Sequence, residues 1–259
     1  MATTSGSSLL LGRDYPEYGK IAVIRAGVAI SAAISVGSDE KSPSHRYKHD
    51  PNVKNEDALC VVERSGRRAF AVADAHFGPE ASHNLIHQIL VSLTKSIPES
   101  GDELLSLVRS LGEARPAQTA SETTLAVAVH DQIVNTGFGV SVGDSTIMLV
   151  SRIGETQVLN RRNNAYVSSA DVSSSLGLTR FEFVTSPGDM LLAFTDGVNE
   201  CHYRHPATSI RESDISEVVS AAGFDHLRVV NDLGQLALKG VRGNPGGQDN
   251  VAIVAASIG

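Results

Sequence analysis

Hydrophobic and polar positions follow two different periods in the first half of the chain. Short runs rich in Val, Ile and Ala, bounded by Gly, Ser, Pro or charged residues, predict strands. These strands fall at residues 21–24, 28–36, 58–62 and 68–73. From Pro79 to Gly112, apolar residues instead recur every three or four positions, which predicts two helices broken near residues 98–101.

Strands return in the second half of the chain. They are predicted at residues 124–129, 133–140, 145–151, 155–159, 181–185 and 190–194. Short connections at 130–132 and 153–154 predict two antiparallel hairpins. The sequence Ser186-Pro187-Gly188-Asp189 predicts a further strand–turn–strand unit between residues 181 and 194.

The chain ends with a helical region over residues 213–222 and 227–238 and a last strand at 250–257. Clustered strands with helical pairs between them are typical of antiparallel sheets flanked by helices. The pattern therefore predicts an α+β fold, with a β-sandwich inside and helices outside. The 259 residues suit one domain, assigned to residues 21–259, and we expect residues 1–20 to be an N-terminal segment of poorer order.

Composition narrows the function classes. The net charge of −7 supplies no basic field for a nucleic-acid backbone, so we expect no nucleic-acid partner. The longest apolar stretch, residues 21–36, is interrupted by Arg25 and serines and is too polar to span a bilayer, so we expect no membrane insertion. Two cysteines give no disulfide framework, and the N-terminus has no secretory pattern, so we expect a cytoplasmic protein.

Carboxylates gather at the ends of four predicted strands. They are Glu56 and Asp57, Asp74, Asp196 and Asp249. A single Asp at a strand end is most often a turn residue or a helix cap, but four such positions together indicate a shared site. Oxygen ligands of this kind suit Mg²⁺ or Mn²⁺, and two ions sharing a carboxylate would activate a bridging water for attack on phosphorus.

Seven short segments between Asn55 and Val254 resemble, in order, the motifs of the metal-dependent protein phosphatases of type 2C, also called the PPM family. Asp74-Ala75-His76-Phe77-Gly78 is similar to the DGHGG motif, and Gly143-Asp144-Ser145 to the GDS motif. The other segments are Asn55–Ala58, Ser121–Leu125, Pro187–Asp189, Leu191–Gly197 and Asp249–Val251. The resemblance rests on the ordered set, since no single segment is specific.

The resemblance implies a four-layer α-β-β-α sandwich with a dinuclear metal centre at its rim. Asp74 would bridge two Mg²⁺ or Mn²⁺ ions, with the carbonyl of Ala75 on the first ion and Asp196 and Asp249 on the second. Glu56 and Asp57 would hold metal-bound waters, and Asp144 would help to bind a third, weaker ion. His76 matches the general acid of the family, which protonates the leaving Ser or Thr oxygen.

Two departures from the family pattern concern metal and phosphate binding. Ala75 replaces a glycine, and any positive φ at that residue would cost energy. The family's phosphate-binding Arg would fall at Asn52, so we expect Arg46 or Lys54 to bind the substrate phosphate, with Arg46 better suited because its guanidinium can bind in a bidentate manner. The stretch 160–175 is shorter than the family's flap segment, which implies a more open site.

Several of these residues also have a purely structural explanation. His76 could cap its turn, Asp144 could be a hairpin turn residue, and Gly188-Asp189 suits a tight turn better than a ligand site. Cys201 is better explained as a packed thiol than as a nucleophile, because no His-Asn dyad accompanies it. The Gly-rich stretch 240–247 lacks a Gly-Lys-Ser/Thr ending and is therefore no P-loop.

Two functions remain open from the sequence. The first is a Ser/Thr phosphatase that acts through metal-activated water on a phosphorylated protein, either a protein kinase or a kinase target. The alternative is a pseudophosphatase, a phosphoprotein-binding or regulatory module with weak or no activity, which Ala75 and Asn52 favour. The presence of Asp74, Asp196 and Asp249 favours the enzyme.

Overall fold

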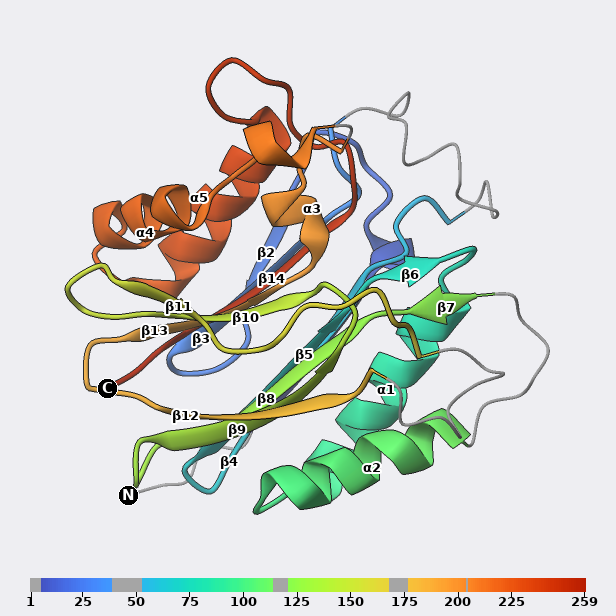
Figure 1. Cartoon of the computed structure of the whole chain (residues 1–259), viewed down its shortest axis with the longest axis vertical. Helices are drawn as coiled ribbons and strands as arrows, with labels where there is room; N and C mark the ends of the chain where they lie inside the picture. The colour runs from blue at the N-terminus through green and yellow to red at the C-terminus, as the bar shows by residue number, and fades with distance from the viewer. Residues whose placement is uncertain (1–5, 39–52, 114–120, 168–176, 204) are drawn as a thin grey trace.

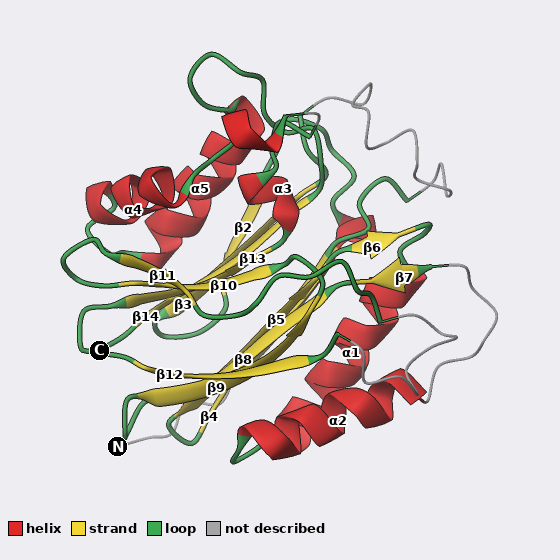
Figure 2. Ribbon diagram, in the orientation of Figure 1, coloured by secondary structure: helices red, strands yellow, loops and turns green. Residues whose placement is uncertain are grey.

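Two six-stranded antiparallel sheets pack face to face, with helices on both outer faces (Figure 1 and Figure 2). This computed structural model describes residues 6–38, 53–113, 121–167, 177–203 and 205–259. The arrangement confirms the predicted four-layer α-β-β-α sandwich. Within these described ranges, none of the helices is long and apolar enough to cross a membrane.

The first sheet has the strand order β1-β4-β5-β8-β9-β12. Its strands are β1 (Gly6–Leu11), β4 (Ala58–Arg64), β5 (Arg67–Ala73), β8 (Leu125–Asp131), β9 (Thr136–Val142) and β12 (Thr179–Val184). The central strands are buried on both faces, which is why they appear in the sequence as continuous apolar runs. Along β5, Phe70 and Val72 face the second sheet, while Ala69 and Ala71 face the outer helices.

The second sheet has the order β11-β10-β13-β14-β3-β2. Its strands are β2 (Ala22–Arg25), β3 (Ile30–Ser35), β10 (Thr146–Val150), β11 (Thr156–Val158), β13 (Met190–Phe194) and β14 (Val251–Ser257). A separate two-stranded ladder joins β6 (Ala75–His76) to β7 (Glu122–Thr123). This small ladder extends the chain beyond the end of β5 and carries part of the DGHGG-like segment.

The helices cover the sheets through one apolar face each. Helices α1 (Glu80–Lys95) and α2 (Gly101–Glu113) pack on the first sheet, as the helical spacing predicted, and α1 buries Leu85, Ile86 and Ile89 there. Helices α4 (Glu212–Ala221) and α5 (His226–Lys239) cover the second sheet. A short helix, α3 (Asp196–Asn199), follows β13 directly.

Two local expectations differ from the structure. Residues 6–11 form β1, paired with β4 in antiparallel register, so the sandwich already includes residues before 21. The predicted turn at 130–132 lies instead over residues 132–135, because the Asp131 carboxylate accepts hydrogen bonds from the N–H groups of Ile133 and Val134. These two side chains are exposed at the turn, so their hydrophobicity gave a misleading strand signal.

Strands β12 and β13 form the predicted strand–turn–strand unit, but they belong to different sheets. β12 pairs with β9 in the first sheet, and β13 pairs with β10 and β14 in the second. Asp189 stabilises the connection, since its carboxylate accepts from the N–H groups of Ser186 and Arg152. The turn therefore passes the chain from one sheet to the other, as Gly188 permits with its φ of 92°.

Candidate metal centre

Three of the predicted metal-binding carboxylates lie at strand ends of the two sheets. Asp74 follows β5, Asp196 follows β13, and Asp249 precedes β14, which pairs with β13 in antiparallel register. Their exposed fractions are 4%, 8% and 8%. The ends of strands from both sheets thus place nearly buried carboxylates at one rim of the sandwich.

Electrostatics show that these groups interact. Burial raises the pKa of Asp196 well above its usual value, and the carboxylates of Asp74, Asp249, Asp144 and Glu200 raise it further. A like charge close to a carboxylate disfavours its ionisation. These four contributions therefore indicate an acidic cluster around Asp196. Asp144, which was predicted to join the site and lies in the connection between β9 and β10, is therefore part of this cluster.

The donor set fits a hard divalent cation. Within the described residues, the Oδ1 atoms of Asp196 and Asp144 are buried and accept no hydrogen bond, a costly state that a cation would relieve. Within the described ranges, no three His, Cys, Asp or Glu side chains converge closely enough to hold a metal ion together. Mg²⁺ commonly binds through one or two carboxylates and keeps several waters, so an open rim of oxygen ligands suits it.

Glu56 is anchored at the rim by backbone hydrogen bonds. Its Oε1 atom accepts from the N–H of Gly78 at 2.9 Å, and its own N–H donates to Oδ1 of Asn250 at 2.8 Å. The Asn250 amide also donates to the carbonyls of Val36 and Lys54, both at 3.1 Å. Asn250 therefore fixes the acidic segment of the first sheet against β14 of the second.

Asp57 is held by a hydroxyl from the other sheet. Thr195 Oγ1 donates to Asp57 Oδ2 at 2.7 Å and accepts from the N–H of Ala252 at 2.9 Å. Asp57 and Thr195 are both fully buried. Because Thr195 directly precedes Asp196, one short segment positions two acidic groups of the site.

His76 lies in β6, half-buried beside the acidic rim. Its imidazole meets the ring of Tyr166 edge-on, with centroids 5.1 Å apart and an interplanar angle of 76°. Burial, followed by Asp144, Glu122, Asp74 and Asp196, raises the pKa of Tyr166 to about 12. Tyr166 thus contacts the histidine, interacts electrostatically with the carboxylates, and keeps its phenolic proton at neutral pH.

The backbone strain of the DGHGG-like segment falls on Phe77, two residues after Ala75. Ala75 is buried in β6 and is absent from the described residues with positive φ, so its replacement of glycine carries no such penalty. Phe77 instead adopts a φ of 63°, a left-handed conformation that costs a bulky residue about 1–2 kcal/mol. Its side chain remains 42% exposed.

Of the two residues predicted to bind the substrate phosphate, Lys54 lies within the described part of the chain. Arg46, like Asn52, lies outside the described residues. Lys54 places its ammonium 5.1 Å from the centroid of the Tyr18 ring, in a cation–π contact beside the acidic segment. Its backbone carbonyl accepts from Asn250, which ties Lys54 to the rim.

The structural readings of other motifs fit what is seen. Burial raises the pKa of Cys201, and its side chain packs in the core beneath α4 and α5, as expected of a packed thiol. Asp189 serves the tight turn between β12 and β13. In the Gly-rich stretch, Gly247 donates its N–H to the Ala237 carbonyl and Gly240 has a φ of 81°, so this segment folds back on the end of α5 before Asp249.

Sequence reasoning missed three residues that shape the site, namely Thr195, Asn250 and Tyr166. The first two directly adjoin the ligand candidates Asp196 and Asp249, and this adjacency was the available signal. Tyr166 carries no comparable signal, because it reaches His76 from a loop distant in sequence.

Comparison with known proteins identifies the family. The family model described as protein phosphatase 2C matches residues 43–231, well over half of the chain, and the chain belongs to this family. The fold and the acidic rim thus define a phosphatase domain of the PPM type. No curated protein matches the chain in a sequence search.

Solved structures of similar fold cover nearly all of the chain. The catalytic domain of the serine/threonine protein phosphatase PstP, determined with two manganese ions, has a TM-score of 0.64 and 20% identity, covering 92% of this chain and 99% of that chain. The PPM Ser-Thr phosphatase MsPP from Mycobacterium smegmatis, in complex with cacodylate, has a TM-score of 0.63 and 19% identity, covering 90% and 99%. RsbX in complex with magnesium has a TM-score of 0.60 and 14% identity, covering 93% and 100%.

Proposed function

We propose that this protein is a metal-dependent phosphatase that hydrolyses phosphoserine and phosphothreonine in proteins. The observation that carries the proposal is the buried rim of Asp74, Asp196 and Asp249, where burial and then the neighbouring carboxylates raise the pKa of Asp196. Such a rim is unfavourable without a cation and well suited to one. The family membership and the manganese and magnesium in the PstP and RsbX structures support the same conclusion.

Each acidic residue has a role in this proposal. Asp74, Asp196 and Asp249, with the Ala75 carbonyl, would hold two Mg²⁺ or Mn²⁺ ions, while Glu56 and Asp57 would act through metal-bound waters and Asp144 would bind a third, weaker ion. When bound, the divalent ions would supply Lewis acidity and would activate water for attack on phosphorus. Thr195 and Asn250 keep Asp57 and Glu56 fixed, so that the ligands need not reorganise during the reaction.

His76 would deliver a proton to the departing Ser or Thr oxygen. A general acid must reach the leaving group while remaining oriented, and the half-buried imidazole, packed edge-on against Tyr166, meets both needs. The phosphate itself would be bound by Arg46 or Lys54. The ammonium of Lys54 already lies near the rim through its contact with Tyr18.

The substrate would be a protein kinase or a kinase target. We also propose a cytoplasmic location, because both cysteines, Cys60 and Cys201, are free and buried. The pseudophosphatase alternative loses one of its two grounds. Ala75 lies in a regular strand without positive φ, and its carbonyl can serve as a ligand just as that of glycine would.

The test is hydrolysis of p-nitrophenyl phosphate and of a phosphoserine peptide by protein freed of metal with EDTA, then supplied with Mn²⁺ or Mg²⁺. We expect no turnover without metal and full recovery on its return, with Asp74→Asn as the inactive control. Phosphatase activity that persisted in the metal-free protein would overturn the mechanism. A folded protein that bound Mn²⁺ but hydrolysed neither substrate would favour the pseudophosphatase.

A further inference from the structure

A cavity of about 560 Å³ lies on the helix-covered side of the second sheet, between β10, β13, α3 and α4. We call it the α3 pocket. Its floor is apolar and consists of Met148, Phe194, Ile210 and Ile215. This volume falls in the range of about 300–1,000 Å³ that is typical of ligand-binding pockets.

The α3 pocket adjoins the candidate metal centre. Phe194 of its floor lies two residues before Asp196, and Thr146 of its lining lies two residues after Asp144. Two residues of strand span about 7 Å, so the lining begins within one side-chain length of the acidic rim. Helix α3 begins at Asp196, and its last residue, Asn199, lines the pocket. One element therefore serves both sites.

Four charged residues line the pocket, namely Arg162, Glu200, Arg211 and Glu212, and both carboxylates have polar partners. Arg162 forms an ion pair with Glu200, with Nη2 and Oε1 2.9 Å apart. The Glu212 carboxylate accepts a hydrogen bond from Thr156 at 3.2 Å. Because both carboxylates that line the α3 pocket already have a partner and its floor is apolar, the pocket suits an uncharged hydrophobic group better than an ionic one.

We propose that the α3 pocket binds a large aliphatic or aromatic side chain of the phosphoprotein substrate, about two to four residues from the phosphorylated Ser or Thr. The spacing follows from the distance between the rim and the pocket, since an extended peptide advances about 3.3–3.6 Å per residue. This inference rests on the proposed function and adds a rule of substrate choice to it. The metal centre selects the phosphate, and the α3 pocket selects the neighbouring sequence.

The test uses a set of phosphoserine peptides with an alanine background, in which one leucine is moved from position −4 to +4. The ratio of kcat/KM between the best leucine peptide and the all-alanine peptide is measured in the Mn²⁺-loaded protein. We expect this ratio to reach about tenfold or more, since hydrophobic pockets discriminate side chains by about 10–200-fold. The same peptides are titrated by fluorescence anisotropy, which reports binding without turnover.

The variant that tests the pocket is Ala207→Trp. Ala207 lines the cavity and is exposed, so an indole there can fill the space without disturbing the core. We expect the leucine preference to fall to about one in both kcat/KM and binding. Ala221→Trp is the matched control, because Ala221 is exposed on α4 and is not among the residues that line the cavity. This variant should keep the preference.

The outcomes separate the inference from the proposed function. If the protein binds leucine peptides preferentially but does not hydrolyse them, the pocket stands and the phosphatase proposal fails. If it hydrolyses all peptides equally, or if the preference survives Ala207→Trp, the pocket assignment is wrong while the phosphatase proposal stands.

Discussion

Buried charged side chains lie at both ends of the strand pair β4 and β5. They are mutually repelling acids at one end and an ion pair at the other. At one end, Asp57 precedes β4 and accepts a hydrogen bond from Thr195, and Asp74 follows β5 and contributes to raising the pKa of Asp196. At the other end, Glu63 and Arg68 form an ion pair with Nε and Oε1 3.1 Å apart, and their side chains are only 8% and 7% exposed. We refer to these as the acidic end and the paired end.

Both charged side chains of the paired end have further hydrogen-bond partners. Glu63 also accepts from the N–H of Val28 and from Gln132, while Arg68 donates to the Ser257 carbonyl at 2.7 Å. Buried ion pairs of this kind persist when further hydrogen bonds satisfy both partners. The paired end therefore joins the first sheet to the last strand of the second and needs no ligand.

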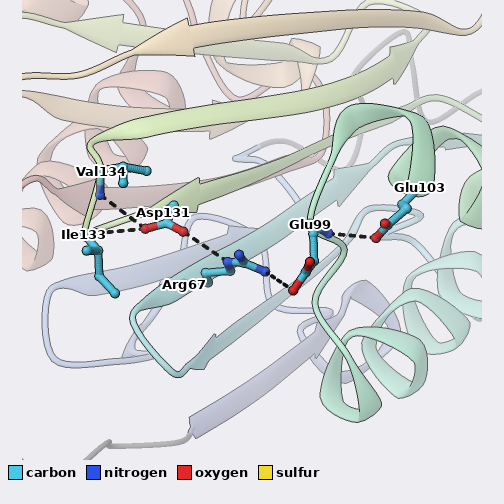
Figure 3. A network of polar contacts seen from close by, with 6 residues as sticks. All are labelled: Arg67, Glu99, Glu103, Asp131, Ile133 and Val134. Atoms are coloured by element: carbon cyan, nitrogen blue, oxygen red, sulfur yellow. Dashed lines mark hydrogen bonds and ion pairs between the residues drawn. The ribbon is translucent and has the colours of Figure 1, made fainter.

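A second network continues the paired end towards the surface (Figure 3). Arg67 bridges Asp131 at 3.1 Å and Glu99 at 3.4 Å. Burial alone would raise the pKa of Asp131, but hydrogen bonds from Ile133, Arg67 and Val134 outweigh it and lower that pKa. The pKa values of Asp131 and Asp196 thus shift in opposite directions, because hydrogen-bond donors surround Asp131 whereas other carboxylates surround the buried Asp196.

This contrast separates structural charges from functional ones. Mutual repulsion at the acidic end opposes folding, and a rim of that kind is retained where it serves a site. Changes at the acidic end should therefore affect catalysis more than stability, and changes at the paired end should do the reverse.

The largest effect is expected for Asp196→Asn. The amide keeps the shape of the side chain but cannot serve as an anionic ligand, so turnover with Mn²⁺ should fall by orders of magnitude. In the metal-free protein the same change removes repulsion with Asp74 and Asp249, and the free energy of unfolding should rise. Urea unfolding with and without Mn²⁺ measures the stability effect, and turnover is assayed alongside. Normal turnover, or a less stable metal-free variant, would show that repulsion between metal ligands does not govern the acidic end.

The next effect concerns His76→Ala and depends on the leaving group. A general acid contributes about 10²–10⁴-fold, so phosphoserine peptides should lose activity in that range. The loss on p-nitrophenyl phosphate should be much smaller, because p-nitrophenolate departs without protonation. Calorimetric titration with Mn²⁺ should show near-normal metal binding. Equal losses on both substrates would mean that His76 supports the turn after Asp74 and donates no proton.

Arg68→Met tests the paired end. It leaves the buried Glu63 carboxylate without its cation, which typically costs about 3–5 kcal/mol of unfolding free energy. The double change Arg68→Met with Glu63→Gln should recover most of that loss, since no charge then remains buried. Turnover per folded molecule should stay normal in both proteins. If turnover fell greatly while the protein remained fully folded, the two ends would be coupled.

The sequence predicted elements well where burial controls the pattern. In β5, β13 and β14, both faces are buried, so their apolar runs are unambiguous, and the acidic residues next to them mark the rim. The crossing between β12 and β13 escaped prediction because a Pro-Gly turn looks the same within a sheet as between sheets. Pairing partners are set by contacts distant in sequence, which local patterns do not encode.

The candidate site was predictable to a similar degree and for the same reason. Ligand types are chemical properties of single residues, so Asp74, Asp196 and Asp249 stand out. The hydrogen bonds from Thr195 to Asp57 and from Glu56 to Asn250 join residues more than a hundred positions apart. The φ of Phe77 depends on the fold around it, whereas the sequence indicated only that a positive φ would be costly at Ala75.

Metal binding should depend on pH at the acidic end. The pKa of Asp196 is raised in the folded protein, so ionisation of this carboxyl lowers the stability of the fold as the pH rises through that pKa. Bound Mn²⁺ removes this cost because it takes the place of the proton. The rise in melting temperature on adding Mn²⁺ should therefore grow with pH, with apparent affinity increasing by up to about tenfold per pH unit for one released proton. Asp196→Asn should flatten this dependence. A metal effect that stayed constant across the acidic to neutral range would contradict the raised pKa.

The smallest effect concerns the strained backbone beside the acidic end. Phe77 has a φ of 63°, and alanine at this position would keep the strain that glycine removes. Phe77→Gly should therefore be more stable than Phe77→Ala by about 1 kcal/mol in urea unfolding, whereas at an ordinary position glycine is the less stable of the two. Comparing these two variants cancels the loss of the phenyl ring, which both share. If alanine proved the more stable, the segment between Asp74 and α1 would carry no strain, and the acidic end would differ from the paired end in charge alone.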